Sequence, residues 1–409
     1  MPTHAATSVR PEAVGLSSPR LAKIDGWMDR LIDDRKLAGV SVNIIRRGEH
    51  IYSAAAGLAD TARGTPMQQD TILRIYSMTK PLVSTAVLML YEDGHFQLDD
   101  PISRYIPAFR HSRVFTGGSR LKYESEPARR EITYRDLLTH TSGLTYGFMD
   151  ANAVDAMYRD NNIDFSTSDL PLGELIDKLA AMPLLAHPGT AWNYSVSTDV
   201  LGRLVEVISG QSLPAFLHER VIGPLGMTDT GFHVPSEKIA RFAALYARGR
   251  DGAPVLIDDP RSSGFTKIRA LASGGGGLVG TAPDYLQFCR CMLGMGTLNG
   301  ERLLGRKTVQ LMTANHLPGD MADMGQARFS ESSYAGVGFG LGFSVMLDPA
   351  KAQILGSPGE FAWGGAASTA FWVDPAEDMA VVLMTQLLPS STYPIRRELR
   401  VLSYQAVTG

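Results

Sequence analysis

A serine and a lysine stand three positions apart in the segment IYSMTKPL, as Ser77 and Lys80. A serine hydroxyl becomes an effective nucleophile only when a nearby base removes its proton. Residues i and i+3 lie on one face of a helix, so we expect the amine of Lys80 beside the hydroxyl of Ser77. A lysine amine acts as a base when burial or a nearby positive potential lowers its pKa. The spacing therefore predicts a nucleophilic serine with a lysine base.

The residues around this pair distinguish it from a second match in the chain. Ser119 and Lys122 have the same spacing, but they lie in a polar stretch with no apolar helix behind it, so we predict no catalysis there. After Ser77, the segment TKPLVSTAVLMLYEDG carries apolar residues at helical spacing and ends on a glycine. We expect a buried helix with Ser77 at its start, where helix N–H groups favour an alkoxide and the Ser77 amide can bind an oxyanion.

We expect the strands and helices that position this helix to come from both ends of the chain. The N-terminal segment SSPRLAKIDGWMDRLIDD has the pattern of an amphipathic helix, and VSVNIIRRGEHIYSAAAG that of a β-hairpin. The last third returns to β-rich runs and closes with a helix in TYPIRRELRVLSYQAV, while the middle shows short helices and loops. We predict an α/β fold of the α+β type, with an antiparallel sheet built from both chain ends and flanked by helices. The expected sheet domain is discontinuous, with an inserted, mostly helical domain and the active site at their interface: residues 1–98 and 251–409 for the sheet, 99–250 for the insertion.

Composition excludes several classes of function. The 409-residue chain is 44% hydrophobic and 20% charged, with a net charge of -3 and no long basic run, so we expect neither nucleic acid nor membrane as a partner. No apolar stretch reaches transmembrane length, and the first twenty residues lack a secretory signal pattern, which together predict a cytoplasmic protein. Cys289 and Cys291, two residues apart, are expected to be buried reduced thiols.

With these residues identified, the chain resembles the serine β-lactamase and penicillin-binding protein superfamily, which carries an S-x-x-K signature. Within it, the chain is most similar to the class C β-lactamase-like group and its family VIII carboxylesterases. RIYSMTKPLVSTAVLML resembles the nucleophile helix, and LDDPISRYIPAF, LLTHTSGL and PLGMTDTGF resemble further family segments in the expected order. The resemblance runs from about Ile24 to Leu387 and implies a β-lactamase/transpeptidase-like fold.

The second family motif resembles Tyr194-Ser195-Val196, within AWNYSVSTDVLG. In the family this tyrosine lies beside the serine and lysine, shares the proton transfer and protonates the leaving group. A phenol next to an ammonium group loses its proton more readily, so this role is chemically reasonable for Tyr194. The resemblance places Val196 at a substrate-binding position.

The third family motif, normally Lys-Thr/Ser-Gly on a strand, is replaced by Trp363-Gly364-Gly365. The resemblance places all three residues at the substrate and puts the N–H of Ala366 in the oxyanion hole with the N–H of Ser77. Glycines allow the strand to approach a substrate closely.

These departures from the family pattern bear on the substrate. The motif lysine would attract the carboxylate of a β-lactam, whereas Trp363 offers a flat apolar wall and one N–H donor, which suit an uncharged ester. The motif asparagine can bind the amide of a β-lactam, whereas Val196 has no polar group. Loss of both contacts favours an esterase over a β-lactamase.

Other kinds of site are less well supported by the sequence. There is no G-x-S-x-G motif of an α/β-hydrolase, and the nine histidines show no metal-ligand spacing. His140 and His187 are interpreted as structural, hydrogen-bonded residues. The loops at residues 145–170 and 318–335 are expected to border the entrance of the site.

The sequence thus predicts a cofactor-free and metal-free serine hydrolase. It would cleave short- to medium-chain carboxylic esters through an acyl-enzyme on Ser77, with Lys80 and Tyr194 as base and acid. The alternatives are a β-lactamase, a D-amino-acid amidase or peptidase, an acyltransferase with the same acyl-enzyme, or a non-catalytic ligand-binding descendant. A small-molecule ester is the expected partner, and both a monomer and a homo-oligomer remain open.

Overall fold

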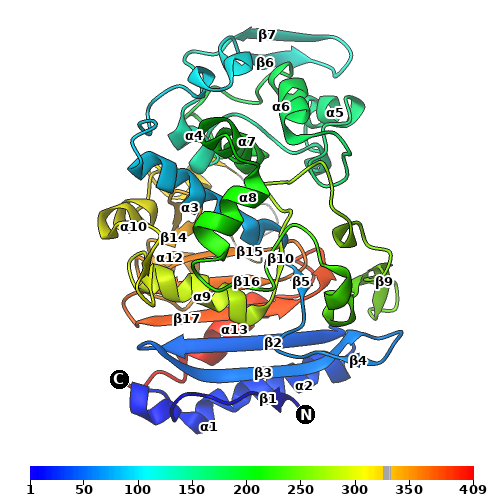
Figure 1. Ribbon diagram of the computed structural model, residues 1–409, viewed down its shortest axis with the longest axis vertical. Helices are drawn as coiled ribbons and strands as arrows, with labels where there is room; N and C mark the ends of the chain where they lie inside the picture. The colour runs from blue at the N-terminus through cyan, green and yellow to red at the C-terminus, as the bar shows by residue number, and fades with distance from the viewer. Residues whose placement is uncertain (326–330, 332) are drawn as a thin grey trace.

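A large antiparallel sheet forms the base of the molecule in the computed structural model, which describes residues 1–325, 331 and 333–409 (Figure 1). Within the described residues, the sheet has nine strands, and they come from both ends of the chain, as the sequence predicted. In spatial order its strands are β1 (Thr3–His4), β3 (Glu49–Asp60), β2 (Gly39–Arg46), β17 (Met379–Thr385), β16 (Ala370–Asp374), β15 (Phe361–Gly364), β14 (Ser344–Met346) and β13 (Val337–Phe339), and β4 (Thr65–Pro66) pairs with β3.

Strands β2 and β17 join the two ends of the chain at the centre of this sheet. They run antiparallel, with Val381 opposite Ile44, and every residue of both strands is buried. Because side chains alternate between the faces of a strand, Val381 packs into one hydrophobic cluster and Val382 into the other. This double burial requires helices on both faces of the sheet.

One face is covered by α1 (Ser18–Leu21), α2 (Lys23–Asp33) and α13 (Ile395–Tyr404), and the other by α9 (Ala282–Leu293) (Figure 1). The N-terminal helix was expected to be continuous, but it is divided at Ala22 into α1 and α2. The indole of Trp27 in α2 donates a hydrogen bond to the Glu398 carboxylate in α13 at 2.7 Å, which ties the first and last long helices together.

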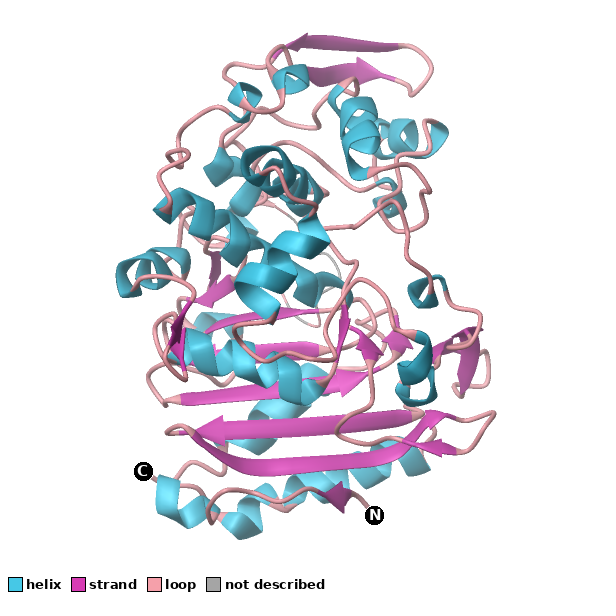
Figure 2. Ribbon diagram, in the orientation of Figure 1, coloured by secondary structure: helices cyan, strands magenta, loops and turns pink. Residues whose placement is uncertain are grey.

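The helical part of the molecule stands at one side of the sheet (Figure 2). It contains α3 (Thr79–Glu92), α4 (Tyr134–Leu138), α5 (Ala153–Asp160), α6 (Leu172–Ala180), α7 (Ser197–Ser209) and α8 (Leu213–Leu217). Helix α3 is buried from Thr79 to Leu90, as predicted, and α7 shares its hydrophobic cluster. These two helices carry or directly follow the residues expected to do chemistry.

The middle of the chain is less purely helical than predicted, because it includes a hairpin and the start of a small sheet. The hairpin pairs β6 (Arg113–Gly118) with β7 (Tyr123–Pro127), and the sheet pairs β8 (Leu245–Arg248) with β9 (Pro254–Asp258) and β18 (Leu387–Leu388). The proposed domain boundaries stay predictions. The remaining elements are β5 (Leu73–Arg74) with β10 (Val279–Gly280), β11 (Thr297–Leu298) with β12 (Glu301–Arg302), α10 (Arg306–Met312), α11 (Met321–Met324) and α12 (Pro349–Ala352).

Candidate active site

Ser77 lies in a short 3-10 turn, η2 (Tyr76–Met78), directly before helix α3. This position agrees with the expectation that Ser77 lies at the start of the buried helix. Pro81 explains why the α-helix itself begins only after Ser77, because in an α-helix the proline ring would clash with the carbonyl four residues earlier, which belongs to Ser77. Tyr76 has a φ of 43°, a left-handed conformation that is unfavourable for a tyrosine and recurs at functional sites. Ser77 thus sits on a locally strained turn at the wall of a cavity.

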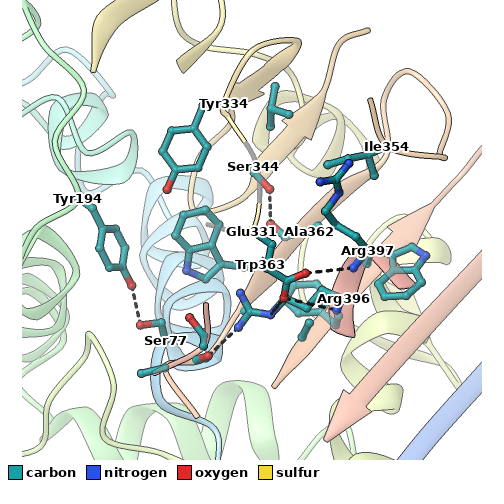
Figure 3. A pocket seen from close by; sticks show the side chains of 18 of the residues that line it. Ser77, Tyr194, Glu331, Tyr334, Ser344, Ile354, Ala362, Trp363, Arg396 and Arg397 are labelled. Carbon is teal, nitrogen blue, oxygen red and sulfur yellow. Dashed lines mark hydrogen bonds and ion pairs between the residues drawn. The ribbon is translucent and has the colours of Figure 1, made fainter. Parts of the chain in front are cut away.

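The structure brings together the three side chains predicted to act in proton transfer. The phenol of Tyr194 donates a hydrogen bond to Ser77 Oγ at 2.5 Å, and Lys80 Nζ donates to the same atom at 3.3 Å (Figure 3). Lys80 is 1% exposed, and its amine lies 4.6 Å from the centre of the Tyr194 ring. A hydroxyl, a buried amine and a phenol therefore share one hydrogen-bonded cluster.

Two further groups hold Lys80, and the sequence did not reveal them. Lys80 Nζ donates to the Gly275 carbonyl at 2.6 Å and to the Tyr146 hydroxyl at 3.0 Å. Burial and the neighbouring Tyr194 and Asp199 raise the pKa of Tyr146 well above its ordinary value, so its phenol stays protonated. A Cβ at Gly275 would lie 2.5 Å from Asp199 Oδ2, so the close packing of this loop on Asp199 requires a glycine. No spacing rule links Tyr146 to Lys80, because their contact is purely tertiary.

Asp199, in the first turn of α7, is a fully buried carboxylate behind Lys80. Its Oδ1 accepts hydrogen bonds from Ser273 Oγ at 2.6 Å and from the Gly275 N–H at 3.0 Å. Its Oδ2 is buried and has no hydrogen-bond partner among the described residues. Burial raises the pKa of Asp199 to about 6, although these hydrogen bonds and the Lys80 charge act in the opposite direction. The carboxylate thus orients the loop that presents the Gly275 carbonyl to Lys80.

Aromatic rings fix the orientation of Tyr194. Its ring centre lies 5.1 Å from that of His140, 5.4 Å from Tyr146 and 5.5 Å from Trp363. Burial and the Lys80 charge lower the pKa of His140 well below its usual value, so its imidazole is neutral. His140 Nδ1 lies 3.2 Å from the Ser195 hydroxyl, which agrees with the structural role expected for this histidine.

Strand β15 ends in the third motif and closes the other side of the cavity. Trp363, Gly364, Gly365 and Ala366 all line this cavity with Ser77. A Cβ at Gly365 would lie 2.4 Å from the Ile75 carbonyl, so the strand approaches the chain just before the nucleophile. In the described part of the chain, the amides of Ser77 and Ala366 donate no hydrogen bond, which leaves both N–H groups available to a ligand.

Val196 differs from the other motif residues. It was expected at the substrate, but it is 1% exposed, belongs to the main hydrophobic cluster and does not line the cavity. The reason is its place at the N-cap of α7, where its backbone N–H donates to the Thr145 carbonyl at 3.3 Å and its side chain turns into the core. Its lack of a polar group therefore says less about substrate choice than the sequence suggested.

The cavity has a volume of about 360 Å³ and a mainly apolar lining. Both loops expected at the entrance contribute to it: Phe148 from residues 145–170, and Met321, Ser333 and Tyr334 from residues 318–335. Residues 326–330 and 332 of the second loop lie outside the described residues. The indole N–H of Trp363 is buried and has no hydrogen-bond partner in the described structure.

The remaining candidates lie apart from this cluster. Ser119 and Lys122 sit in the turn of the β6–β7 hairpin, where the backbone N–H of Lys122 donates to the serine hydroxyl at 3.3 Å. His187 lies 2.9 Å from Glu126 on the surface. Among the described residues, no group of three or more histidine, cysteine or acidic side chains is arranged to hold a metal ion. No helix in the described part of the chain combines the length and apolar character needed to cross a bilayer.

Comparison with known proteins places this geometry in a family. The profile described as Beta-lactamase matches residues 24–406. The chain belongs to the β-lactamase family. It is 37% identical to Protein Rv1367c of Mycobacterium tuberculosis, over 86% of each chain, and 35% identical to Esterase EstB of Burkholderia gladioli, over 93% of this chain and 94% of that protein. Among solved structures it resembles EstCE1, a hydrolase with promiscuous acyltransferase activity, with a TM-score of 0.77 and 30% identity over 96% of this chain and 99% of EstCE1.

Proposed function

We propose that this protein is a serine carboxylesterase that hydrolyses short- to medium-chain carboxylic esters through an acyl-enzyme on Ser77. The observation that carries the proposal is the convergence of Tyr194 and Lys80 on the Ser77 hydroxyl, at 2.5 and 3.3 Å. Membership in the β-lactamase family and the similarity to Esterase EstB support a serine acyl-enzyme hydrolase or acyltransferase. The apolar lining and Trp363 favour an uncharged ester over a carboxylate-bearing β-lactam.

In this mechanism Lys80, assisted by Tyr194, takes the proton of Ser77 while Ser77 Oγ bonds to the ester carbonyl carbon. The carbonyl electron pair moves onto oxygen, where the N–H groups of Ser77 and Ala366 stabilise the negative charge. The intermediate collapses, the bond to the alcohol oxygen breaks, and Tyr194 gives that oxygen a proton. Water gives a proton to Tyr194 and attacks the acyl carbon, the bond from this carbon to Ser77 Oγ breaks, and Lys80 returns its proton to Ser77 as the carboxylic acid leaves. Tyr146 and Gly275 orient the Lys80 amine throughout.

Acyl transfer is a second candidate fate of the same acyl-enzyme. EstCE1, which this chain resembles, is described as a hydrolase with promiscuous acyltransferase activity. Water and a small alcohol would compete for one intermediate, so addition of alcohol should divert acyl groups to a new ester. Product analysis with and without the alcohol measures this partition.

The test of the proposed function is replacement of the nucleophile, Ser77→Ala. With p-nitrophenyl butyrate, we expect kcat to fall by at least about 1,000-fold, because the acyl-enzyme can no longer form. Intact-protein mass spectrometry of the wild type after brief incubation with a slow ester should show an acyl adduct on Ser77. Wild-type turnover that survives the substitution would refute the assignment.

Parallel assays with nitrocefin and D-alanyl amides compare the ester with the alternative substrates. Faster turnover of nitrocefin than of the ester would reverse the substrate choice. Absence of labelling of Ser77 by a serine-directed phosphonate would favour a non-catalytic binder.

A further inference from the structure

Arg396, near the start of α13, reaches from the helix to the strand that bears the third motif. Its Nη2 donates to the Gly365 carbonyl at 2.7 Å and to the Thr369 carbonyl at 2.9 Å. Figure 3 shows its side chain extending toward the Ser77 end of the cavity, beyond Trp363. No family motif identified in the sequence includes this arginine.

The Gly365 carbonyl belongs to the same peptide unit as the N–H of Ala366. That carbonyl accepts a second hydrogen bond, from the Ser368 N–H at 3.2 Å. Hydrogen bonds polarise one another along a chain, so donors on a peptide oxygen make its N–H a stronger donor. A cationic donor such as a guanidinium has the larger effect, because charge-assisted hydrogen bonds are stronger than neutral ones. Ala366 lines the cavity, and its N–H has no hydrogen-bond partner in the described part of the chain. The hydrogen bond of Arg396 to the Gly365 carbonyl therefore both fixes and polarises this N–H.

The sequence of the motif provides room for this guanidinium. A Cβ at Gly364 would lie 2.7 Å from Arg396 Cζ, so a larger residue would displace the arginine from the strand. The nearest carboxylate, on Glu331, approaches Arg396 Nε only to 3.9 Å, and it accepts hydrogen bonds from the N–H groups of Arg396 and Arg397 instead. The buried Nε has no hydrogen-bond partner among the described residues. The guanidinium is thus directed at the two carbonyls of the turn rather than neutralised in a close ion pair.

We propose that Arg396 is a positioning residue for the oxyanion hole: it locks and polarises the Gly365–Ala366 peptide so that its N–H stabilises the developing oxyanion. The inference rests on the proposed function, because it needs Ser77 to form a tetrahedral adduct beside this peptide. It assigns to helix α13 a part in catalysis that the motif residues alone do not provide.

The test compares Arg396→Met with Arg396→Lys and with Arg269→Met as a matched control. Arg269 also donates to two backbone carbonyls, those of Ser166 and Ser168, but it does not line the cavity. Each protein is assayed for kcat and KM with p-nitrophenyl butyrate, for affinity toward phenylboronic acid, and for its melting temperature. The boronic acid forms a tetrahedral anion on a serine and so reports oxyanion stabilisation without turnover.

For Arg396→Met we expect kcat to fall about tenfold with little change in KM, less than the loss of a whole oxyanion-hole donor. Boronate affinity should fall by a similar factor, and added guanidinium ion should restore part of both. Arg396→Lys keeps the charge but has a less extended donor group, so its kcat and boronate affinity should lie between those of the wild type and of Arg396→Met. If the methionine variant does not fold, the lysine variant is measured in its place. Arg269→Met should match the wild type.

The inference is overturned if Arg396→Met, or the lysine variant in its place, keeps wild-type kcat and boronate affinity. It is also overturned if kcat, KM and melting temperature all change together without a response to guanidinium, which would indicate a purely structural role, or if the wild type binds no boronate. Failure of the proposed function looks different, because the wild type would then bind boronate but hydrolyse no ester.

Discussion

At the scale of single residues, the site depends on which charges are buried around Lys80. Besides Ser77 Oγ, the amine donates to two further uncharged oxygens, those of Gly275 and Tyr146. The buried carboxylate of Asp199 stands behind these two groups and does not contact the amine. A buried carboxylate costs free energy when it is ionised, and this cost appears as the raised pKa of Asp199, about 6 against an ordinary value of 3.8. Asp199 therefore makes stability depend on pH in the opposite direction from most carboxylates.

Replacement of Asp199 by asparagine tests this dependence. Between about pH 4 and pH 6 the folded protein holds a proton that the unfolded chain releases, so the contribution of this carboxyl to stability falls as pH rises and stays lost above pH 6. Asparagine keeps the Oδ1 acceptor for Ser273 and Gly275 but cannot ionise. The wild type should therefore lose up to about 3 kcal/mol relative to Asp199→Asn across this range. Urea denaturation of both proteins as a function of pH measures the difference, and parallel curves would contradict it.

At the scale of elements, the site forms where the end of strand β15 packs against the turn that precedes helix α3. Strand β15 reaches the turn before α3 because Gly365 has no side chain: a Cβ there would lie 2.3 Å from Thr369 Oγ1 and 2.4 Å from the Ile75 carbonyl. The Ile75 carbonyl is backbone and cannot move aside without moving the nucleophile. The motif glycine is thus a packing requirement as well as a matter of substrate access.

Gly365→Ala should separate the strand from the turn that carries Ser77. A displacement of about 1 Å in a catalytic group can cost about 100-fold in rate, so we expect a fall of this order in kcat/KM together with a lower melting temperature. Gly117→Ala in β6 is the control, because a Cβ there meets no atom within 4 Å. Equal activity of the two variants would show that the close approach is not needed.

At the scale of the whole molecule, one hydrophobic cluster joins the sheet to the helical part and holds the two halves of the site together. Lys80 lies on α3, Tyr194 precedes α7, and both helices contribute to the cluster that also contains Phe371 and Val382 of the sheet. The other face of the sheet has its own cluster with α2 and α13, and α13 carries Arg396. Elements packed on both faces of the sheet therefore contribute residues to the same cavity: Ser77 before α3, and Arg396 from α13.

Leu201→Ala in α7 tests the contribution of this shared cluster to stability. Leu201 is 0% exposed, and truncation of a buried leucine leaves a cavity that costs about 2–5 kcal/mol of the free energy of unfolding. Leu121→Ala is the matched control, since that side chain is 85% exposed and its loss should change stability by less than about 0.5 kcal/mol. Urea denaturation measures both variants, and a neutral Leu201→Ala would show that the cluster does not join the two parts.

The sequence alone determined what depends on local spacing and pattern. Ser77 and Lys80 are three residues apart, so a helix start brings them together whatever surrounds it. Alternating and fully apolar runs at both ends gave the strands β2, β15, β16 and β17. The sequence also proposed Tyr194 and the third motif, through their resemblance to a family.

Only the tertiary structure decided which distant groups surround and position the reacting residues. Tyr146, Asp199 and Arg396 lie 66, 119 and 316 positions beyond Lys80 along the chain, and no pattern connects them to it. Their contacts arise where loops and helices pack, a long-range outcome that propensity and periodicity do not encode. The same packing buries the side chain of Val196 in the core. Val196 is the N-cap of α7, and the orientation of this helix points its side chain away from the substrate position that the motif predicted.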